Sequence, residues 1–288
     1  MDKEAGEASG TQALDRAAGL LRLVASSTGR GARLADLIAQ ASLSKPTTHR
    51  LLRALERLGL VDQDPGTRLY HLGPEAFVIG ALAAERFGIH RAALPSLARL
   101  AAASEDTAFL SVRRDWHAVC LHREEGTFPI RTHVLNAGDR HPLGVGAGSL
   151  AILAALPVNE AEAAIVASTE EIKARYPDFS SALLSGLVAQ TRARGYALNP
   201  GLLMAGSVGV GVPVLNREGR CEGALSIAAI EARLGEARQQ ELAVLLKAEA
   251  HRLAERLAKP TGASDLSTPT ARRQPAAVGA SRNRRLAP

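Results

Sequence analysis

The apolar residues in the first third of the chain recur with the spacing of α-helices. This pattern predicts a helix over 13–26, a short helix over 34–40 and, after a break at 41–43, a third helix from Ser44 to a stop at Gly59. Ser44 is a favourable N-cap, and Pro46 falls in the first turn, where its missing N–H does no harm. The expected buried stripes of the first and third helices are Leu14, Ala17, Ala18, Leu21 and Val24, and Thr48, Leu51, Leu52, Leu55 and Leu58.

Two short segments at 60–61 and 68–72 follow the third helix and flank the turn sequence Asp64-Pro65-Gly66-Thr67. They predict a β-hairpin, or wing, beside the helices. Arg68 at the start of the second strand would contact phosphates or enter the minor groove of DNA. The alternative is a hairpin that only closes a small core.

The period changes to that of strands after Asp106. The segments 107–114, 116–124 and 127–135 alternate between apolar and polar positions, which is typical of an antiparallel meander. A glycine-rich turn and a helix are predicted within 141–156, and further helices over 160–167, 181–194 and 236–257. Two more strands are predicted over 207–215 and 221–230, joined by a turn at 216–219.

These elements predict an α+β fold of more than one domain. The expected divisions are a polar, disordered lead over 1–10, a winged helix-turn-helix over 11–73 and a linker helix over 74–89 that begins at Pro74. A mixed α/β domain over 90–258 begins with an apolar helix over 91–104, and a disordered basic tail over 259–288 completes the chain.

Positive charge is concentrated in two regions of the 288-residue chain, whose formal net charge is +6. The excess lies in the helix-turn-helix region and in the tail, while 81–258 balances to neutrality. This distribution indicates a nucleic acid that contacts part of the surface only. An aromatic content of 3% offers few rings for stacking on single-stranded bases.

The N-terminal half of the third helix carries polar and basic side chains on its solvent side. Helix-turn-helix proteins place this half in the major groove, where arginine pairs with guanine and a threonine methyl group contacts thymine. The candidate DNA contacts are Arg33, Ser44, Lys45, Thr47, Thr48, His49, Arg50 and Arg68. The alternative is an ordinary solvated basic helix.

No catalytic or metal-binding pattern is found in the sequence. The glycines at 144–148 lack the Lys-Ser/Thr of a phosphate-binding loop, and no Gly-x-Ser-x-Gly elbow occurs. His117, His122, His133 and His141 lack metal-ligand spacing and are expected to be surface or hydrogen-bonded residues. No catalytic residue, metal or cofactor is therefore predicted.

Cysteine usage and hydropathy indicate a cytoplasmic protein. Cys120 and Cys221 match no metal or redox motif and suit a reducing compartment. No apolar run reaches the roughly 18 residues that a membrane span requires, and no membrane partner is expected.

The segments KPTTHRLLRALERLGLV (45–61) and RLYHLG (68–73) resemble the winged helix-turn-helix of the IclR family of bacterial transcriptional regulators. The order of elements over 90–258 is similar to the GAF-like effector-binding domain of that family, so the likeness covers 11–258. The resemblance implies a regulator that binds a double-stranded DNA operator under the control of a small-molecule effector, an organic acid or aromatic catabolite. It also implies a linker helix that crosses to a second subunit, in a homodimer or homotetramer.

The resemblance further implies an effector site between a Gly-Ala turn, the strand after an RGYA-type motif and a Ser-x-Ser strand. The residues at the matching positions are Gly146, Ala147, Asn199, Gly209, Ser226 and Ala228. Members that bind small oxo-acids carry Cys and a second Ser where this chain has Gly209 and Ala228, and Leu202 replaces a frequent Glu. We therefore expect an effector that is less polar or bulkier than glyoxylate-sized acids. The alternative is that these are only turn and strand residues.

The alternative function is a small-molecule-binding enzyme or sensor whose N-terminal helices serve only for dimerisation. The sequence does not distinguish activator from repressor or dimer from tetramer.

Overall fold

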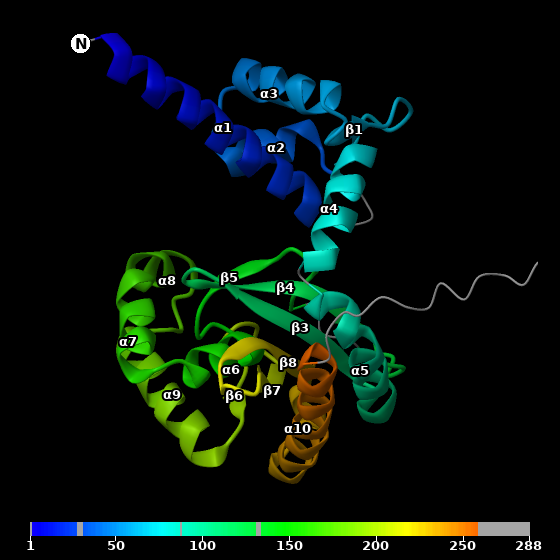
Figure 1. Ribbon diagram of the computed structural model, residues 1–288, viewed down its shortest axis with the longest axis vertical. Coiled ribbons are helices and arrows are strands. Elements are labelled where there is room, and N and C mark those ends of the chain that lie inside the picture. The colour runs from blue at the N-terminus through cyan, green and yellow to red at the C-terminus, as the bar shows by residue number, and fades with distance from the viewer. Residues whose placement is uncertain (1, 28–30, 87, 131–133, 259–288) are drawn as a thin grey trace, which may run out of the picture. The chain divides into compact units, whose positions relative to one another are not determined.

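The computed structural model describes residues 2–27, 31–86, 88–130 and 134–258, without the side chains of 2–10 and 84–86 (Figure 1). Three helices and a two-stranded hairpin come first, followed by two helices and then six strands interleaved with five α-helices, all within these ranges. The order confirms the predicted α+β fold, with a winged helix-turn-helix before a mixed α/β domain. None of the described helices is both long and apolar enough to cross a membrane.

The N-terminal unit is a bundle of α1 (Asp2–Ser26), α2 (Leu34–Ala41) and α3 (Lys45–Arg57). The three helices enclose one small apolar core because each carries its apolar residues on a single face. The most buried side chains of this core are Leu20, Val24, Leu37, Leu52, Leu55, Val61 and Tyr70.

Helix α1 starts earlier than the sequence predicts. It runs through the segment 2–10, which we expected to be disordered, and not from Ala13. This segment contains alanine, glutamate and lysine, which are strong helix formers, so the helix extends beyond its packed part. The predicted stripe is also shifted, since Leu14 is 70% exposed and Leu20 is fully buried.

The wing consists of β1 (Val61–Gln63) and β2 (Tyr70–Leu72), paired antiparallel with Val61 opposite Leu72. Ala32 forms an isolated bridge to Tyr70, which ties the segment before α2 to the wing. The second strand begins at Tyr70, two residues later than predicted. Arg68 has a left-handed backbone with φ of 61° and therefore belongs to the turn.

Helix α4 (Pro74–Arg86) occupies the predicted linker, with Pro74 at its first position. Its described side chains include an unusual group of exposed apolar residues. Phe77 is 78% exposed, and Val78, Ile79 and Leu82 are also exposed. An apolar helix surface of this kind indicates a protein partner.

The C-terminal domain is built on one antiparallel sheet of six strands in the order β5-β4-β3-β8-β7-β6. The two central strands, β3 (Thr107–Arg114) and β8 (Cys221–Ile230), pair with Phe109 opposite Ser226. The remaining strands are β4 (His117–Glu124), β5 (Arg140–Pro142), β6 (Ala197–Asn199) and β7 (Ser207–Leu215).

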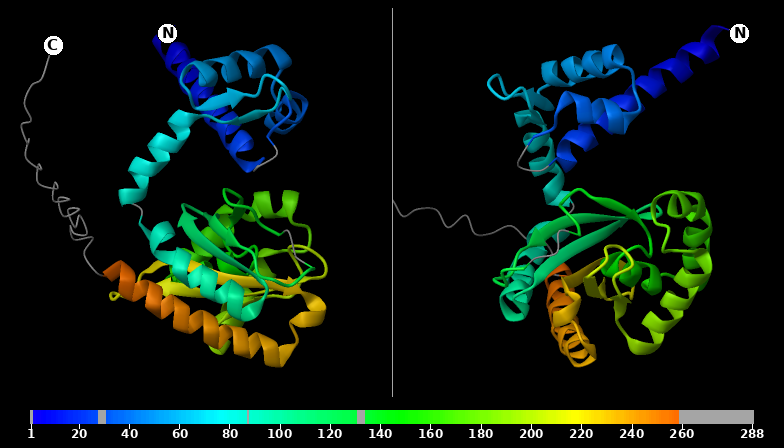
Figure 2. Two further views of the ribbon diagram at one scale, coloured as in Figure 1. Left: turned by 90° about the vertical axis from the view of Figure 1, so that its right-hand side faces the viewer. Right: turned by 180° about the vertical axis from the view of Figure 1, so that it is seen from behind.

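Helices cover both faces of this sheet (Figure 2). One face packs against α5 (Ile89–Ser104) and α10 (Glu236–Ala258), through residues such as Leu97, Leu110 and Leu246. The other face packs against α6 (Ala147–Ala155), with α9 (Ser181–Arg194) beside it at β6. The helix α7 (Val158–Ala167) packs against α6, α9 and α8 (Thr169–Arg175).

The predicted third strand of the meander, 127–135, is wrong in the described part of that segment, and 131–133 lie outside the described residues. The segment leaves the sheet because Phe128 is held elsewhere. Its N–H donates to the Glu105 carbonyl at 2.9 Å, and its ring lies 3.7 Å from the Arg233 guanidinium carbon. Strand β5 pairs with β4 instead. The sequence pattern also missed the short elements α8 and β6.

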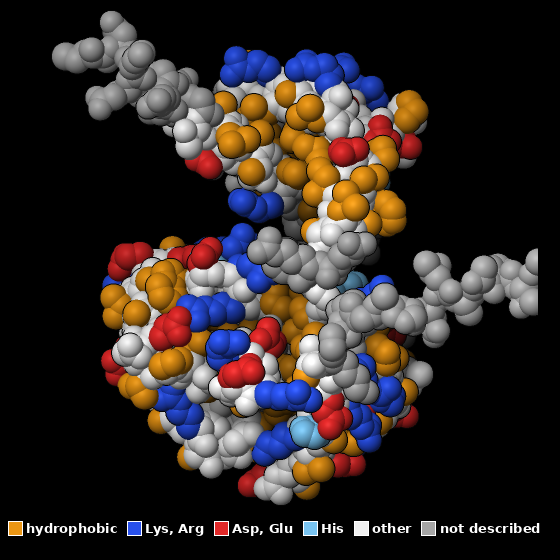
Figure 3. Space-filling model, viewed as in Figure 1, with side chains coloured by type: hydrophobic (Ala, Val, Ile, Leu, Met, Phe, Trp, Pro, Cys, Tyr) orange, Lys and Arg blue, Asp and Glu red, His pale blue; other side chains and the backbone are white. Residues whose placement is uncertain are grey.

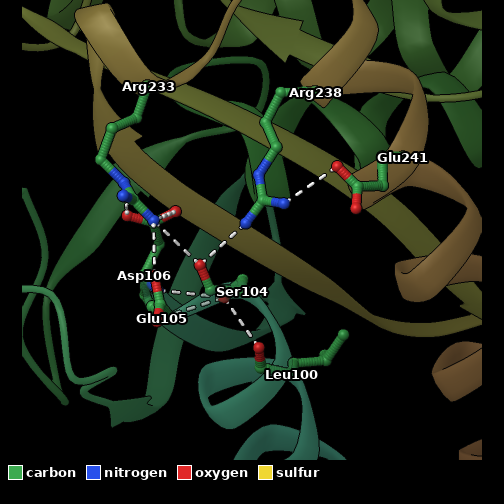
Figure 4. A network of polar contacts seen from close by, with 7 residues as sticks. All are labelled: Leu100, Ser104, Glu105, Asp106, Arg233, Arg238 and Glu241. Atoms are coloured by element: carbon green, nitrogen blue, oxygen red, sulfur yellow. Dashed lines mark hydrogen bonds and ion pairs between the residues drawn. The ribbon is translucent and has the colours of Figure 1, made fainter.

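A polar network joins the start of β3 to the segment after β8 (Figure 4). Arg233 Nε donates to the buried Asp106 carboxylate at 3.0 Å. Arg238 donates to the Ser104 carbonyl at 2.9 Å and to Glu241 at 2.9 Å. This network fixes the junction between α5 and β3 against the 3₁₀ turn Glu231–Arg233.

Candidate functional site

The predicted site residues lie in two regions of the structure, and the first region is α3. The backbone of Ser44 is extended and its carbonyl accepts from Thr48 N at 2.9 Å, so Ser44 occupies the N-cap position as predicted. Its hydroxyl does not cap the helix but lies 2.9 Å from Thr47 Oγ1. Gly59, with φ of 68°, follows the last turn as the predicted stop.

The solvent face of α3 is a row of cationic side chains. Lys45, His49 and Arg50 are exposed, and Arg53 and Arg57 continue the same face at helical spacing. Figure 3 shows Lys and Arg side chains gathered along α3. The candidate contacts predicted on this helix stop at Arg50, although the i, i+3, i+7 spacing of Arg50, Arg53 and Arg57 was a usable signal.

Two residues of this helix bear on the predicted buried stripe. Thr48, predicted both in that stripe and as a DNA contact, is 0% exposed, and its hydroxyl donates to the Ser44 carbonyl at 3.1 Å. It faces the core and cannot reach DNA, so it leaves the candidate set. Leu58, predicted to be buried, is 64% exposed, because the helix ends at Arg57 and the chain turns away.

The wing and the start of α2 present the two remaining candidates. Asp64 organises the turn by accepting hydrogen bonds from Thr67 N at 2.6 Å and Thr67 Oγ1 at 2.8 Å. These bonds lower the pKa of Asp64. Arg68 follows this turn and is exposed, and Arg33 is exposed at the N-cap of α2.

The second place is a cavity in the C-terminal domain that brings all six predicted effector residues together. Gly146 and Ala147 come from the start of α6, Asn199 from the end of β6, Gly209 from β7, and Ser226 and Ala228 from β8. Residues that the sequence did not predict complete the lining. They are Phe109, Val134, Leu135, Gly148, Leu203, Ser207 and Ile227.

Three buried polar side chains line this cavity: Asn199, Ser207 and Ser226. Asn199 Oδ1 accepts from Leu202 N at 3.1 Å. Among the described residues, Asn199 Nδ2 and Ser226 Oγ have no hydrogen-bond partner. The start of α6 adds backbone N–H groups, which favour a negatively charged group. The site is therefore suited to a small molecule with a hydrogen-bond acceptor.

Glycines allow α6 to approach the sheet closely. A β-carbon at Gly211 would lie 2.6 Å from the Ala147 carbonyl oxygen, and one at Gly148 would lie 3.0 Å from Ser226 Oγ. Gly146 has φ of 87°, which favours glycine. These contacts place the first turn of α6 directly over β7 and β8, where the cavity lies.

His117, His122 and His141 each lie at hydrogen-bond distance from another side chain, which confirms the expectation for these three. His117 contacts Glu171 at 2.8 Å, His122 contacts Glu124 at 3.1 Å, and His141 contacts the Tyr176 hydroxyl at 2.8 Å. His133 lies outside the described residues. No group of three or more His, Cys, Asp or Glu side chains within the described ranges is arranged to hold a metal ion.

A winged helix-turn-helix with a cationic recognition helix, joined to a domain with a small-molecule cavity, defines a ligand-responsive DNA-binding protein. Comparison with known families agrees. The IclR helix-turn-helix domain matches residues 13–65, and the C-terminal domain of the bacterial transcriptional regulator IclR matches residues 81–255. The chain belongs to the IclR family and is a DNA-binding transcriptional regulator of that type.

Individual relatives cover most of the chain. The HTH-type transcriptional regulator KipR of Bacillus subtilis strain 168 is 30% identical over 207 residues, which are 71% of this chain and 81% of KipR. The glycerol operon regulatory protein of Streptomyces griseus is 30% identical over 216 residues, 75% of this chain and 84% of that protein.

Solved structures share the fold. The crystal structure of an IclR transcriptional regulator from Alicyclobacillus acidocaldarius has a TM-score of 0.69 at 26% identity, over 85% of this chain and 98% of that one. An IclR homologue from Microbacterium hydrocarbonoxydans, solved in complex with 4-hydroxybenzoate, has a TM-score of 0.67 at 19% identity, with the same shares.

Proposed function

We propose that α3 recognises a double-stranded operator through Lys45, Thr47, His49 and Arg50. Ser44, Arg33 and Arg68 contact the DNA backbone around it. One observation carries this proposal. Among the described residues, Lys45, Arg50 and Arg57 have no carboxylate within ion-pair distance, so α3 presents uncompensated positive charge to solvent. Such charge binds phosphates and releases their counterions.

The operator proposal is tested by selecting bound duplexes from a random pool with the full chain. Affinity for the selected duplex should fall with salt, with a log–log slope of about −0.9 for each phosphate neutralised. A protein without duplex affinity at low salt would favour the alternative function, in which the N-terminal helices only dimerise.

We further propose that the protein acts as a homodimer or homotetramer. The exposed apolar residues Phe77, Val78, Ile79 and Leu82 of α4 support a subunit interface there. Two DNA-binding heads about 34 Å apart would then contact successive major grooves of a near-palindromic operator. Light scattering on the full chain measures the assembly, and a monomer at micromolar concentration would contradict it.

The proposed effector is an organic acid or aromatic catabolite that binds the cavity beneath α6 and changes the affinity for DNA. The buried polar groups Asn199 and Ser226 support this assignment, and the Microbacterium homologue was solved with an aromatic acid. A ligand at 100 times its Kd should add about 2.7 kcal/mol to the unfolding free energy. Stabilisation by glyoxylate or pyruvate alone would contradict the expected bulkier effector.

The cavity serves regulation in this proposal, and no catalytic step is assigned to it. Its lining has no pairing of a nucleophile with a base among the described residues. The protein is proposed to act in the cytoplasm, where its operator is.

A further inference from the structure

The effector cavity is nearly filled in this structure. The space left in it is about 30 Å³. Small-molecule sites usually have about 300–1,000 Å³. A ligand must therefore displace part of the lining before it can bind.

The lining differs in how firmly each part is held. Phe109 lies in central strand β3, and Ala147 is packed against β7 by the close approach at Gly211. Leu203, by contrast, lies in the loop 200–206 between β6 and β7. Gly201, with φ of 95°, and Gly206, with φ of 75°, flank it in conformations that favour glycine.

Leu203 reaches from this loop to the first turn of α6. Its Cδ2 atom lies 3.2 Å from the position of a β-carbon on Gly146, so Leu203 lies against the start of α6. Backbone groups of Leu202, Met204 and Gly206 hold this loop. Ser207 N donates to the Met204 carbonyl at 3.1 Å. Leu202 N donates to Asn199 Oδ1 at 3.1 Å, and Glu231 N donates to the Gly206 carbonyl at 2.9 Å.

The hydrogen bond from Leu202 N also determines which group of Asn199 is available to a ligand. Because Leu202 N is a donor, the Asn199 oxygen must face it, and the Nδ2 amide is the group left for the cavity. Asn199 is 6% exposed and Ser226 is 4% exposed. Both side chains belong to buried residues, and both can donate to an acceptor on the ligand.

We propose that Leu203 is the residue that sets the size of the effector's apolar body, for the organic acid already assigned to this cavity. The carboxylate accepts hydrogen bonds from Asn199 Nδ2, Ser226 Oγ and the N–H groups at the start of α6. The apolar body takes the place of the Leu203 side chain, which moves outward with its loop. This inference rests on the proposed effector role of the cavity.

The test measures binding of benzoate and of pyruvate to the full chain by calorimetry. Leu203→Ala should bind benzoate about tenfold more tightly than the unmodified protein, the factor that about 1.4 kcal/mol of avoided displacement gives. Pyruvate should gain little, because it is small. Met204→Ala is the matched control on the same loop: its side chain is 44% exposed and does not line the cavity, so it should leave the benzoate affinity unchanged.

A second variant tests the polarity of the site. Asn199→Asp keeps an oxygen for Leu202 N but replaces the donor with a negative charge, and it should weaken benzoate binding by at least about tenfold. Thermal unfolding of each variant checks that it is folded.

Benzoate that binds Leu203→Ala no more tightly than the unmodified protein, or binds neither, overturns the inference. Asn199→Asp that binds benzoate as tightly as the unmodified protein also overturns the inference. A different result would contradict the proposed function. If benzoate binds as expected but does not change the affinity for the selected duplex, Leu203 still sets the ligand size, but the cavity does not regulate DNA binding.

Discussion

Gly73 passes so close to Gly59 that a β-carbon on Gly73 would overlap the Gly59 carbonyl group. The same carbonyl accepts from Glu75 N at 3.0 Å, and Gly73 N donates to the Leu60 carbonyl at 2.9 Å. The end of α3, the end of the wing and the start of α4 thus meet at two glycines. This junction fixes the direction in which the linker helix leaves the DNA-binding unit.

Gly73→Ala should destabilise this junction, because the added methyl group meets backbone atoms that cannot move aside cheaply. The expected loss of unfolding free energy is about 1–3 kcal/mol. Gly80→Ala is the matched control in α4, since nothing lies within 4 Å of its β-carbon position. It should gain about 0.5–1 kcal/mol from helix propensity. Denaturant unfolding measures both changes in unfolding free energy. Changes of the same sign in the two variants would contradict the assignment of Gly73 to a crowded junction.

Thr48 is expected to support the fold and not DNA recognition. Thr48→Ala removes a buried methyl group and hydroxyl and should cost about 1–2 kcal/mol of stability. The ratio of affinities for the selected and random duplexes should stay unchanged, whereas Thr47→Ala should lower it. A Thr48→Ala protein of normal stability with a reduced ratio would return Thr48 to the DNA contacts.

The Arg233–Asp106 pair is expected to be the main support of the α5–β3 junction (Figure 4). Arg233→Ala leaves the buried Asp106 carboxylate without its bidentate partner and removes the cation over Phe128. The expected cost is about 3 kcal/mol. Arg220→Ala, whose surface pair with Glu218 spans 3.5 Å, should change stability by less than about 0.5 kcal/mol. A small effect of Arg233→Ala would show that the network is dispensable.

His141 should make the protein sensitive to mild acid. Burial lowers the pKa of His141 from 6.5 to about 4, so the folded state holds the imidazole neutral while the unfolded state protonates it. Stability is therefore full above pH 6.5 and falls as the pH drops toward 4. Between pH 7 and 5 the loss should be roughly 2 kcal/mol.

The interval from pH 7 to 5 separates this effect from that of Glu249. Hydrogen bonds from Arg99, Ser96 and Arg252 outweigh burial and lower the pKa of Glu249 to about 2, so its contribution is lost only as the pH falls below about 4.5. His141→Gln should flatten the profile above pH 5, and the surface variant His251→Gln should not. An unchanged slope in His141→Gln would assign the acid sensitivity to another group.

Local sequence patterns predicted the bounds of the helices and strands that have capping or turn residues at their ends. Helix α9 has the predicted bounds, Ser181 to Arg194, because Ser180 caps its start and Gly195, with φ of 76°, ends it. Strands β7 and β8 also have the predicted bounds. The six predicted effector residues came from the family resemblance, and the structure places them around one cavity, beside seven lining residues that were not predicted.

Tertiary contacts decided what the sequence could not. The alternation over 127–135 predicted a strand, but Arg233 and Glu105, distant in sequence, hold Phe128 away from the sheet. The position of Thr48 fits both the pattern of a buried stripe and the pattern of DNA contacts. Only the packing of α1 and α2 against α3 shows that Thr48 is buried. Leu203 lies in a loop without periodicity, so nothing local indicated that it reaches the cavity.

The central claim is that the exposed face of α3 recognises base sequence. It is tested most directly by comparing the Kd of Arg50→Ala and of the unmodified protein on a selected duplex and on random DNA of equal length. If Arg50 pairs with a base, the loss should be about 1–3 kcal/mol on the selected duplex and much smaller on random DNA. Equal losses on both would make Arg50 a phosphate contact, and no loss on either would contradict the account.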